Sequence, residues 1–490
     1  MVPEVIEPIY LPLKGRFERI VRLNQTPILI TEQGQTVQWN PLTNKTVPIP
    51  VKKENGDQFL KINPRFLFWE HGMSEAIYFE NNNVWLIEPA NGNQLKATLL
   101  FEGIDIDAYI KFAQYSRKMN TLFIGTDSKG LYIVRSVSAQ TMKSRAGSMQ
   151  YRNAFYSQIE LKPGVVLTNE GMLVAANPTS GITAPIKGRF DFHTYQSPDS
   201  FFYFTKWDPS LRGNTLHRLD LHTNTIKKFD RFKLSSSTVM TTAGKRLFIA
   251  NNSGIAEVIN DSINYLYEFV GKEGAYPVYN LKEVAPGKLA VAGCFGLTLF
   301  DYNTKKADTV FQKPGYCVRT VWNYKDYLFF GTYGAGYFVL HNGNVTPMPL
   351  DKMKFLLYTH CFVPDQNGFC WISTNRGLFK VSISDMVAVA DGEKKPVYYH
   401  FLGKNDGMEM TELNGGCNTC AVVLKDHTIS FPSMDGLVWV NPQRATIILP
   451  AGKIFLDEVV IDGKTYQPDS VQLDRLSAAT KEIKLHLGIP

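Results

Sequence analysis

One short pattern recurs along the chain, and its spacing limits the fold more than any other feature of the sequence. In each copy an apolar run ends in a small residue, turn residues and a glycine follow, and a second apolar run begins, as between Tyr327 and Asn344. Glycine supplies the positive φ of a tight turn, so each copy predicts a β-hairpin. The turn glycines, spaced 40 to 42 residues apart, are Gly130, Gly171, Gly213, Gly254, Gly296, Gly336 and Gly377.

The glycines near Gly336 also suggest a phosphate-binding loop. A dinucleotide site, however, needs a helix directly after its glycines. The run from Tyr337 to Leu340 is typical of a strand instead, and His341-Asn342-Gly343 ends it. The sequence therefore indicates a hairpin and excludes a nucleotide site here.

A second turn follows many of the hairpins and leads into a further strand. In Asp301-Tyr-Asn-Thr304, for example, an acidic residue and a threonine provide turn chemistry before the apolar run from Ala307 to Phe311. Four short strands in about 40 residues, repeated many times, are the sequence form of a β-propeller blade. We therefore predict an all-β protein built from propeller blades.

The repeats divide into two groups. Three copies precede residue 140, a polar segment from Ser136 to Ala154 has the character of a linker, and seven copies follow. Because seven blades commonly close a ring, residues 150–446 are expected to form a seven-bladed propeller and residues 1–140 the last three blades of another. Residues 450–490, with the turn Asp462-Gly463, are expected to be the truncated start of an immunoglobulin-like β-sandwich, so the chain looks like an excerpt.

Composition restricts the functional classes. The formal net charge of +7 is spread over short mixed clusters and forms no concentrated basic face, which argues against nucleic-acid binding. No apolar stretch approaches the ~18 residues of a membrane helix. The N-terminus lacks the pattern of a signal peptide, which fits either a cytoplasmic protein or a chain given without its leader.

The cysteine count predicts no disulfide framework. Six cysteines are few for a chain of 490 residues. Cys294, Cys361 and Cys370 lie in or beside predicted strands and are expected to be buried apolar residues. Cys417 and Cys420 have CxxC spacing, for which inert packing is the default, with a disulfide in this loop or metal ligation as alternatives.

One repeat resembles a known family closely. Asp365-Gln-Asn-Gly368-Phe-Cys-Trp371-Ile-Ser-Thr374 followed by Gly377-Leu378 is similar to the two-component-regulator propeller repeat of bacterial sensor proteins. The last repeat, ending in Gly436-Leu-Val-Trp439-Val-Asn-Pro442, resembles the closing segment of that family, and the segment IFLDEVVIDGK resembles its triple-tyrosine (Y_Y_Y) domain. Elsewhere phenylalanine or alanine replaces the signature tryptophan, which is tolerable in a strand.

The resemblance implies the extracytoplasmic, periplasmic sensor region of a two-component protein. Such proteins pass a signal through a membrane helix, here outside the chain, to a histidine kinase or a DNA-binding domain. Many sense oligosaccharides, so the expected partner is an oligosaccharide or other small molecule, with a homodimer in the full-length protein and no cofactor. The downstream output domain is not contained in these residues.

The sequence contains no recognisable catalytic constellation. There is no G-x-S-x-G elbow, HExxH motif or P-loop, and Asp105 and Asp107, placed on one face of a predicted strand, lack a third metal ligand. We therefore expect a binding region without catalysis. A propeller lyase or hydrolase acting on a glycan or lactone, and a protein-interaction scaffold, are the alternatives.

Aligning the repeats gives a candidate ligand site. Three tyrosines, 40 and 42 residues apart, occupy one repeat position just before the first strand of a blade, which in a propeller lines the central channel. They could form an aromatic rim that stacks on sugar rings, with two polar neighbours, or they could simply pack between blades. Two further aromatic residues lie in hairpin turns. The candidate set is Tyr276, Tyr316 and Tyr358 with Arg319 and His360, and Tyr333 and Trp207 in the turns.

Overall fold

The protein is almost entirely β-structure and forms two compact units, Met1–Ser136 and Val137–Pro490. The described part of the chain contains one α-helix, α1 (Ile383–Ala390), and none of its helices is long and apolar enough to cross a membrane. The computed structural model describes residues 16–54, 58–70, 72–91, 93–144, 153–176, 182–234, 238–260, 262–269, 276–445, 455–467 and 476–488.

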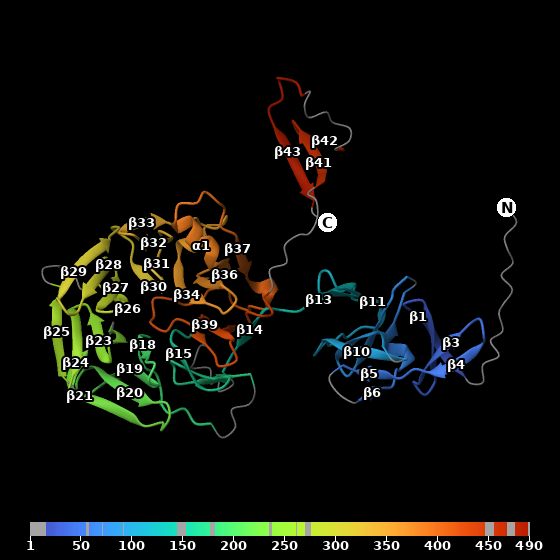
Figure 1. The fold of residues 1–490 in the computed structure, drawn as a ribbon, viewed down its shortest axis with the longest axis horizontal. Coiled ribbons are helices and arrows are strands. Elements are labelled where there is room, and N and C mark those ends of the chain that lie inside the picture. Colours follow the sequence, from blue (N-terminus) through green and yellow to red (C-terminus); the bar gives the residue numbers. More distant parts are fainter. Residues whose placement is uncertain are drawn as a thin grey trace. The chain divides into compact units, whose positions relative to one another are not determined.

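Seven antiparallel sheets in the second unit form a seven-bladed propeller, which confirms the predicted fold class. Four blades run in simple chain order (Figure 1). They are β18 (Thr194–Gln196), β19 (Phe201–Asp208), β20 (Gly213–Asp220) and β21 (Ile226–Leu234); β22 (Val239–Ala243), β23 (Arg246–Asn251), β24 (Gly254–Ile259) and β25 (Ser262–Glu268); β26 (Val278–Ala285), β27 (Lys288–Gly293), β28 (Gly296–Asp301) and β29 (Lys306–Phe311); and β30 (Val318–Tyr324), β31 (Tyr327–Thr332), β32 (Tyr337–His341) and β33 (Asn344–Pro347).

The other three blades depart from this form. One has α1 inserted before its last strand, one has three strands, and one takes a strand from an earlier part of the chain. They are β34 (Thr359–Pro364), β35 (Phe369–Thr374), β36 (Gly377–Ser382) and β37 (Tyr399–Leu402); β15 (Gln158–Lys162), β16 (Val165–Thr168) and β17 (Leu173–Ala175); and β38 (Val422–Val423), β39 (Ile429–Ser433) and β40 (Gly436–Val440) with β14 (Ala139–Met142).

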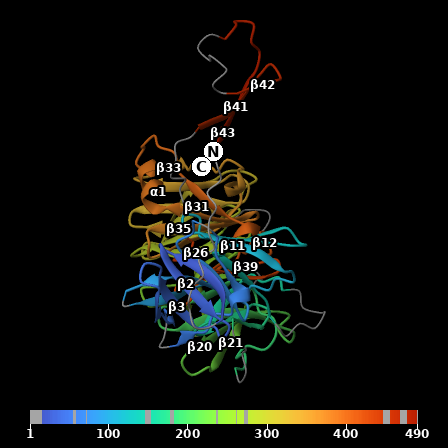
Figure 2. The ribbon, with the colours of Figure 1, turned by 90° about the vertical axis from the view of Figure 1, so that its right-hand side faces the viewer.

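The first strand of each blade lies at the axis. First strands of successive blades contact one another, β18 with β22, β22 with β26, β26 with β30, and β30 with β34, and β15 contacts β38. The blade of β18 to β21 lies across the ring from β33 and α1, as both views show (Figures 1 and 2). The residues just before these strands therefore surround one mouth of the central channel.

Strand β14 closes the ring and corrects one prediction. Ala139 pairs with Val440 and Met142 with Leu437, so the last blade is built from both ends of the ring. The interpretation of residues 136–154 as a linker is therefore wrong for this segment. Its polar composition hid a strand because β14 lies at the outer edge of its blade, where only Ala139 and Met142 are buried.

The repeated glycines have a packing role in addition to their turn role. Gly254, Gly296, Gly377 and Gly436 all have positive φ at the start of the third strand of a blade. A Cβ at Gly296 would lie 2.0 Å from the carbonyl oxygen of Phe311 on the fourth strand. Gly213 differs, because in its longer turn Arg212 takes the positive φ of 49°.

The cores lie between neighbouring blades. Trp371, which is fully buried, illustrates the fit, since its Nε1 donates to Asp365 Oδ2 at 2.9 Å. The ammonium of Lys380 also lies over the Trp371 ring, 5.3 Å from the ring centroid. The Asp and Trp of the signature repeat thus hold each other in place across a turn.

The first unit contains three sheets. Its outer sheets have four and three strands, whereas the middle one has six, because β5 pairs in parallel with β10 and β6 pairs with β5. The strands are β1 (Phe17–Leu23), β2 (Thr26–Thr31), β3 (Thr36–Asn40) and β4 (Lys45–Pro48); β5 (Val51–Lys53), β6 (Phe59–Leu60), β7 (Leu67–Phe68), β8 (Ala76–Glu80), β9 (Asn83–Ala90) and β10 (Gln94–Phe101); and β11 (Ile110–Ser116), β12 (Thr121–Thr126) and β13 (Leu131–Arg135).

The C-terminal segment forms a separate three-stranded sheet. β41 (Phe455–Ile461) pairs with β42 (Lys464–Tyr466) across the predicted Asp462-Gly463 turn, and β43 (Ile483–Gly488) pairs with the other edge of β41. The predicted hairpin and following strand are therefore confirmed.

Candidate functional site

The candidate residues lie at the mouth of the channel where the first strands begin. Tyr276, Tyr316 and Tyr358 each lie one or two residues before the first strand of a blade, as the repeat alignment predicted. Tyr358 is 37% exposed and Tyr333 is 39% exposed, so both present ring surface to solvent. Each of these two residues thus has a packed part and an exposed part.

Arg319, the second residue of β30, contacts two aromatic rings. Its guanidinium carbon lies 4.4 Å from the ring centroid of Tyr279 and 4.5 Å from that of Tyr333. Such cation–π contacts hold the planar guanidinium in one orientation. Arg319 forms no hydrogen bond or ion pair with the described residues, and its buried Nε has no partner among them.

His360, the second residue of β34, lies beside the same cluster. Its Nε2 lies 2.6 Å from Asn375 Oδ1, and Asn375 Nδ2 donates to the hydroxyl of Tyr333 at 3.3 Å. Because an amide oxygen only accepts, Nε2 carries the proton and Nδ1 is a bare acceptor, for which the described residues offer no partner. The ring of Tyr333 lies 4.9 Å from that of Tyr358, edge to face.

None of the described contacts joins Trp207 to this cluster. Trp207 is on β19, 60% exposed, on a different blade, and Tyr276 is 43% exposed before β26. Tyr316 is closer, since its ring lies 3.0 Å from the position that a Cβ on Gly334 would occupy, and Gly334 also adjoins Tyr358. The described contacts therefore link Tyr316, Arg319, Tyr333, Tyr358 and His360.

A segment of the last blade crosses this end of the channel. We call Leu413–Cys420 the axial loop. Asn418 Nδ2 donates to the Met240 carbonyl at 3.1 Å, and Thr419 Oγ1 donates to the Thr194 carbonyl at 3.0 Å. Asn414 Nδ2 donates to the Phe155 carbonyl at 2.6 Å. The loop thus reaches several blades from inside the ring.

The axial loop also touches the candidate site. A Cβ on Gly415 would lie 2.1 Å from His360 Nδ1, and one on Gly416 would lie 2.2 Å from Arg319 Nη1. Only a glycine backbone can approach both side chains this closely. The two consecutive glycines in this loop are therefore explained by the site beneath them.

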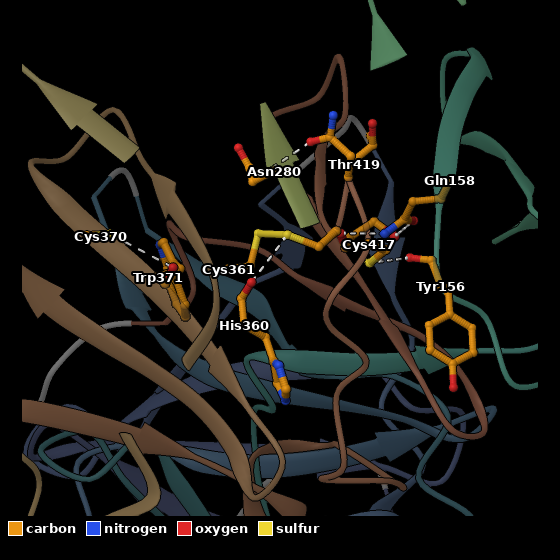
Figure 3. The surroundings of a disulfide bond; sticks show 12 residues. Tyr156, Gln158, Asn280, His360, Cys361, Cys370, Trp371, Cys417 and Thr419 are labelled. Carbon is orange, nitrogen blue, oxygen red and sulfur yellow. Dashed lines mark hydrogen bonds between the residues drawn. A yellow bond between two sulfur atoms is a disulfide. The ribbon is translucent and has the colours of Figure 1, made fainter. Parts of the chain in front are cut away.

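Two disulfides hold this region, which overturns the prediction of inert packing for Cys294, Cys361 and Cys420, and Figure 3 shows the surroundings of the bond at Cys361. Cys361, beside His360, pairs with Cys420 of the axial loop, and Cys294 pairs with Cys317. Neither pair follows the CxxC spacing, because the partners come from different blades or from the loop. Cys370 and Cys417 are free and buried as predicted, and the Cys417 thiol donates to the Tyr156 carbonyl at 3.3 Å.

The histidines at the channel are neutral at pH 7. Burial lowers the pKa of His360 to about 4, with the Arg319 charge acting in the same direction against the Asn375 hydrogen bond. Burial, again helped by Arg319, lowers the pKa of His193 to about 3. Both ring nitrogens of His193 are buried without partners among the described residues. Arg319 is therefore the charged member of this group.

Sequence reasoning missed Tyr279, Asn375 and His193. A signal for Tyr279 exists, since Tyr279, Arg319 and His360 are 40 and 41 residues apart and each is the second residue of a first strand. Asn375 lies in a hairpin turn and His193 before the short strand β18, where the chain carries no comparable signal.

The acidic pair of the first unit does not form the predicted arrangement. Residues 103–107 are not a strand; Asp105 lines a cavity of about 520 Å³ with Tyr78 and Tyr109, whereas Asp107 pairs with Lys129 at 3.0 Å. The described residues contain no group of three His, Cys, Asp or Glu side chains that could hold a metal ion.

No known protein-family profile matches the chain, and no curated protein matches it significantly. Solved structures do. The extracellular domain of BT3049 from B. thetaiotaomicron, described as part of a hybrid two component system, aligns over 96% of this chain and 61% of its own length, with 14% identity and a TM-score of 0.56. The extracellular domain of BT4673 from the same organism aligns over 94% of this chain and 64% of its own length, with 14% identity and a TM-score of 0.46.

The comparison with BT3049 bears on the fold. The chain shares its architecture with the BT3049 domain, a protein of the kind that the repeat signature indicated, and it spans less than two thirds of that domain. At the level of fold, the resemblance drawn from Asp365 to Leu378 is confirmed.

Proposed function

We propose that this chain is the ligand-sensing, extracytoplasmic region of a bacterial two-component signalling protein, and that it binds an oligosaccharide at the channel mouth. The observation that carries the proposal is the contact of Arg319 with the ring of Tyr333, which in turn contacts the ring of Tyr358, so that two partly exposed rings lie beside a cation. Sugar-binding sites pair aromatic faces with a few placed polar groups in this way. The shared fold with the BT3049 extracellular domain agrees with a periplasmic sensor.

The proposal includes the remaining parts of the chain. The three sheets of the first unit are the last blades of a first propeller, and the sheet of β41, β42 and β43 begins an immunoglobulin-like domain. In the full-length protein we expect a homodimer whose signal passes through this domain to a kinase or a transcription regulator. The region itself binds without catalysis.

The test is a titration calorimetry screen against an oligosaccharide panel, with chromatography of each mixture. A sensor binds at least one member with micromolar affinity and leaves it intact, whereas accumulating products would identify a propeller lyase or hydrolase. Replacing Tyr333 and Tyr358 together by alanine is expected to weaken binding roughly tenfold or more, from two lost stacking contacts.

The matched control is Tyr265→Ala. Tyr265 is 39% exposed, like Tyr333, but lies on the outermost strand β25. This substitution should leave the affinity for the oligosaccharide unchanged. Equal loss in both variants, or binding that survives in the double variant, would remove the channel mouth as the site.

A further inference from the structure

Arg319 is a fixed cation whose hydrogen-bond donors are unused. A guanidinium carries five N–H donors and stays charged at every physiological pH. The rings of Tyr279 and Tyr333 contact it, but they accept none of these donors in the described structure. No described carboxylate pairs with it. Its buried Nε has no described partner, and leaving a buried donor of a charged group unpaired is unfavourable, whereas an anion bound to the guanidinium would compensate the charge.

The surroundings of Arg319 leave its charge uncompensated. Its electrostatic neighbours are His193, His360 and Cys417, whose pKa values are shifted so that all three are neutral at pH 7. His193 and His360 are almost fully buried and retain ring nitrogens without described partners. Arg319 is therefore the one charge in a set of buried, neutral polar groups, with no described anion beside it.

The chemistry of the receiving groups selects the ligand class. A planar guanidinium with donors in a fork matches a carboxylate with two bonds. The adjoining faces of Tyr333 and Tyr358 are exposed and match a sugar ring. Asn375, linked to both Tyr333 and His360, can bond sugar hydroxyls.

We propose that the ligand is a uronate-containing oligosaccharide whose carboxylate binds Arg319 while its rings stack on the tyrosines of the channel mouth. This inference rests on the proposed function and narrows it, since a neutral sugar could stack on the tyrosines and accept hydrogen bonds but would leave the guanidinium charge uncompensated. The tyrosines provide affinity for any sugar, and Arg319 provides the preference for acid.

The experiment compares matched ligand pairs on the wild-type protein. Oligosaccharides built on galacturonate, glucuronate and mannuronate are titrated beside their carboxyl-reduced, neutral forms. We expect at least one acidic member to bind at least tenfold more tightly than its reduced form. If neutral forms bind as well as or better than acidic ones, the inference is overturned while the sensor proposal stands; if no oligosaccharide binds, both fail.

Variants of Arg319 then test whether this residue causes the preference for acidic ligands. Arg319→Gln should abolish the difference within a pair, and Arg319→Lys should retain only part of it, because an ammonium cannot make the paired bonds. Arg212→Gln removes the same charge from an exposed hairpin turn and should retain the full difference. A preference that persists in Arg319→Gln, with the fold verified by circular dichroism, contradicts the assignment.

A further set of ligands distinguishes a carboxylate from a sulfate as the anion that binds Arg319. Sulfated neutral oligosaccharides are titrated at the same ionic strength. They should bind more weakly than the acidic member of the best pair, since the proposal assigns Arg319 to a carboxylate. Tighter binding of a sulfated ligand would overturn the uronate assignment.

Discussion

Gly130 in the first unit and Gly296 in the ring occupy the same repeat position but have different surroundings. Both have positive φ, 75° and 112°. Nothing lies within 4 Å of a Cβ added to Gly130, because β13 is the last strand of its sheet, whereas the same Cβ on Gly296 meets the backbone of β29. One motif thus specifies a turn at both positions, and at Gly296 a fourth strand also lies so close that no side chain fits.

The contrast extends to the bonds that stabilise each unit internally. The ring is closed by β14 and by two disulfides, all six cysteines lying after residue 290, so none is in the first unit. The two terminal sheets of the first unit expose Ile20 on β1 and Leu131 and Ile133 on β13. The ring is thus stabilised by long-range bonds that the described residues of the first unit do not show.

The largest expected difference between the units comes from reduction. Cys361–Cys420 closes a separation of 59 residues and Cys294–Cys317 one of 23, and opening such loops costs about 3 to 4 kcal/mol each. With dithiothreitol, hydrogen exchange should rise strongly in ring peptides and remain unchanged in peptides of residues 16–135. Equal changes in both units, or none in either, would contradict this assignment of the stabilising bonds.

The next difference concerns the closing strand. Ala139→Asp places a carboxylate at a position that is 3% exposed, so we expect the ring to lose roughly 3 kcal/mol. Its control is Ile133→Asp on β13, which is 55% exposed and should change stability by about 0.5 kcal/mol or less. Denaturant unfolding, followed by hydrogen exchange in peptides of each unit, measures the stability change of both variants. A mild effect of Ala139→Asp would mean that β14 does not secure the ring.

The smallest effect tests the opening comparison directly. Gly130→Ala should cost about 1 kcal/mol, the penalty of positive φ alone. Gly296→Ala should cost about 2 kcal/mol more, because its methyl group collides with the Phe311 carbonyl. The unfolding free energies of the two variants give the difference. Equal losses of unfolding free energy in the two variants would show that the fourth strand can shift to accommodate the methyl group.

Much of the fold could be predicted because it depends on local chemistry. The hairpin turns, their spacing and the Asp462-Gly463 turn each need residue types that are visible in the chain. The positions of Tyr316, Arg319, Tyr358 and His360 near the start of a first strand followed from the repeat. Equal spacing in the sequence places residues at the same level along the axis of a ring. The strand Ala139–Met142 did not, because an edge strand with few buried residues has no apolar alternation.

The sequence by itself determined that this protein is a set of repeated four-stranded units with turn glycines, and that tyrosines recur where those units meet the axis. Only the tertiary structure decided which strand closes the ring, which cysteines pair, and that Gly415 and Gly416 pass over His360 and Arg319. The physical reason is range. Turn and strand preferences act between neighbours in the chain, whereas closure, disulfide pairing and the unpaired guanidinium of Arg319 arise from groups that meet only when distant blades come together.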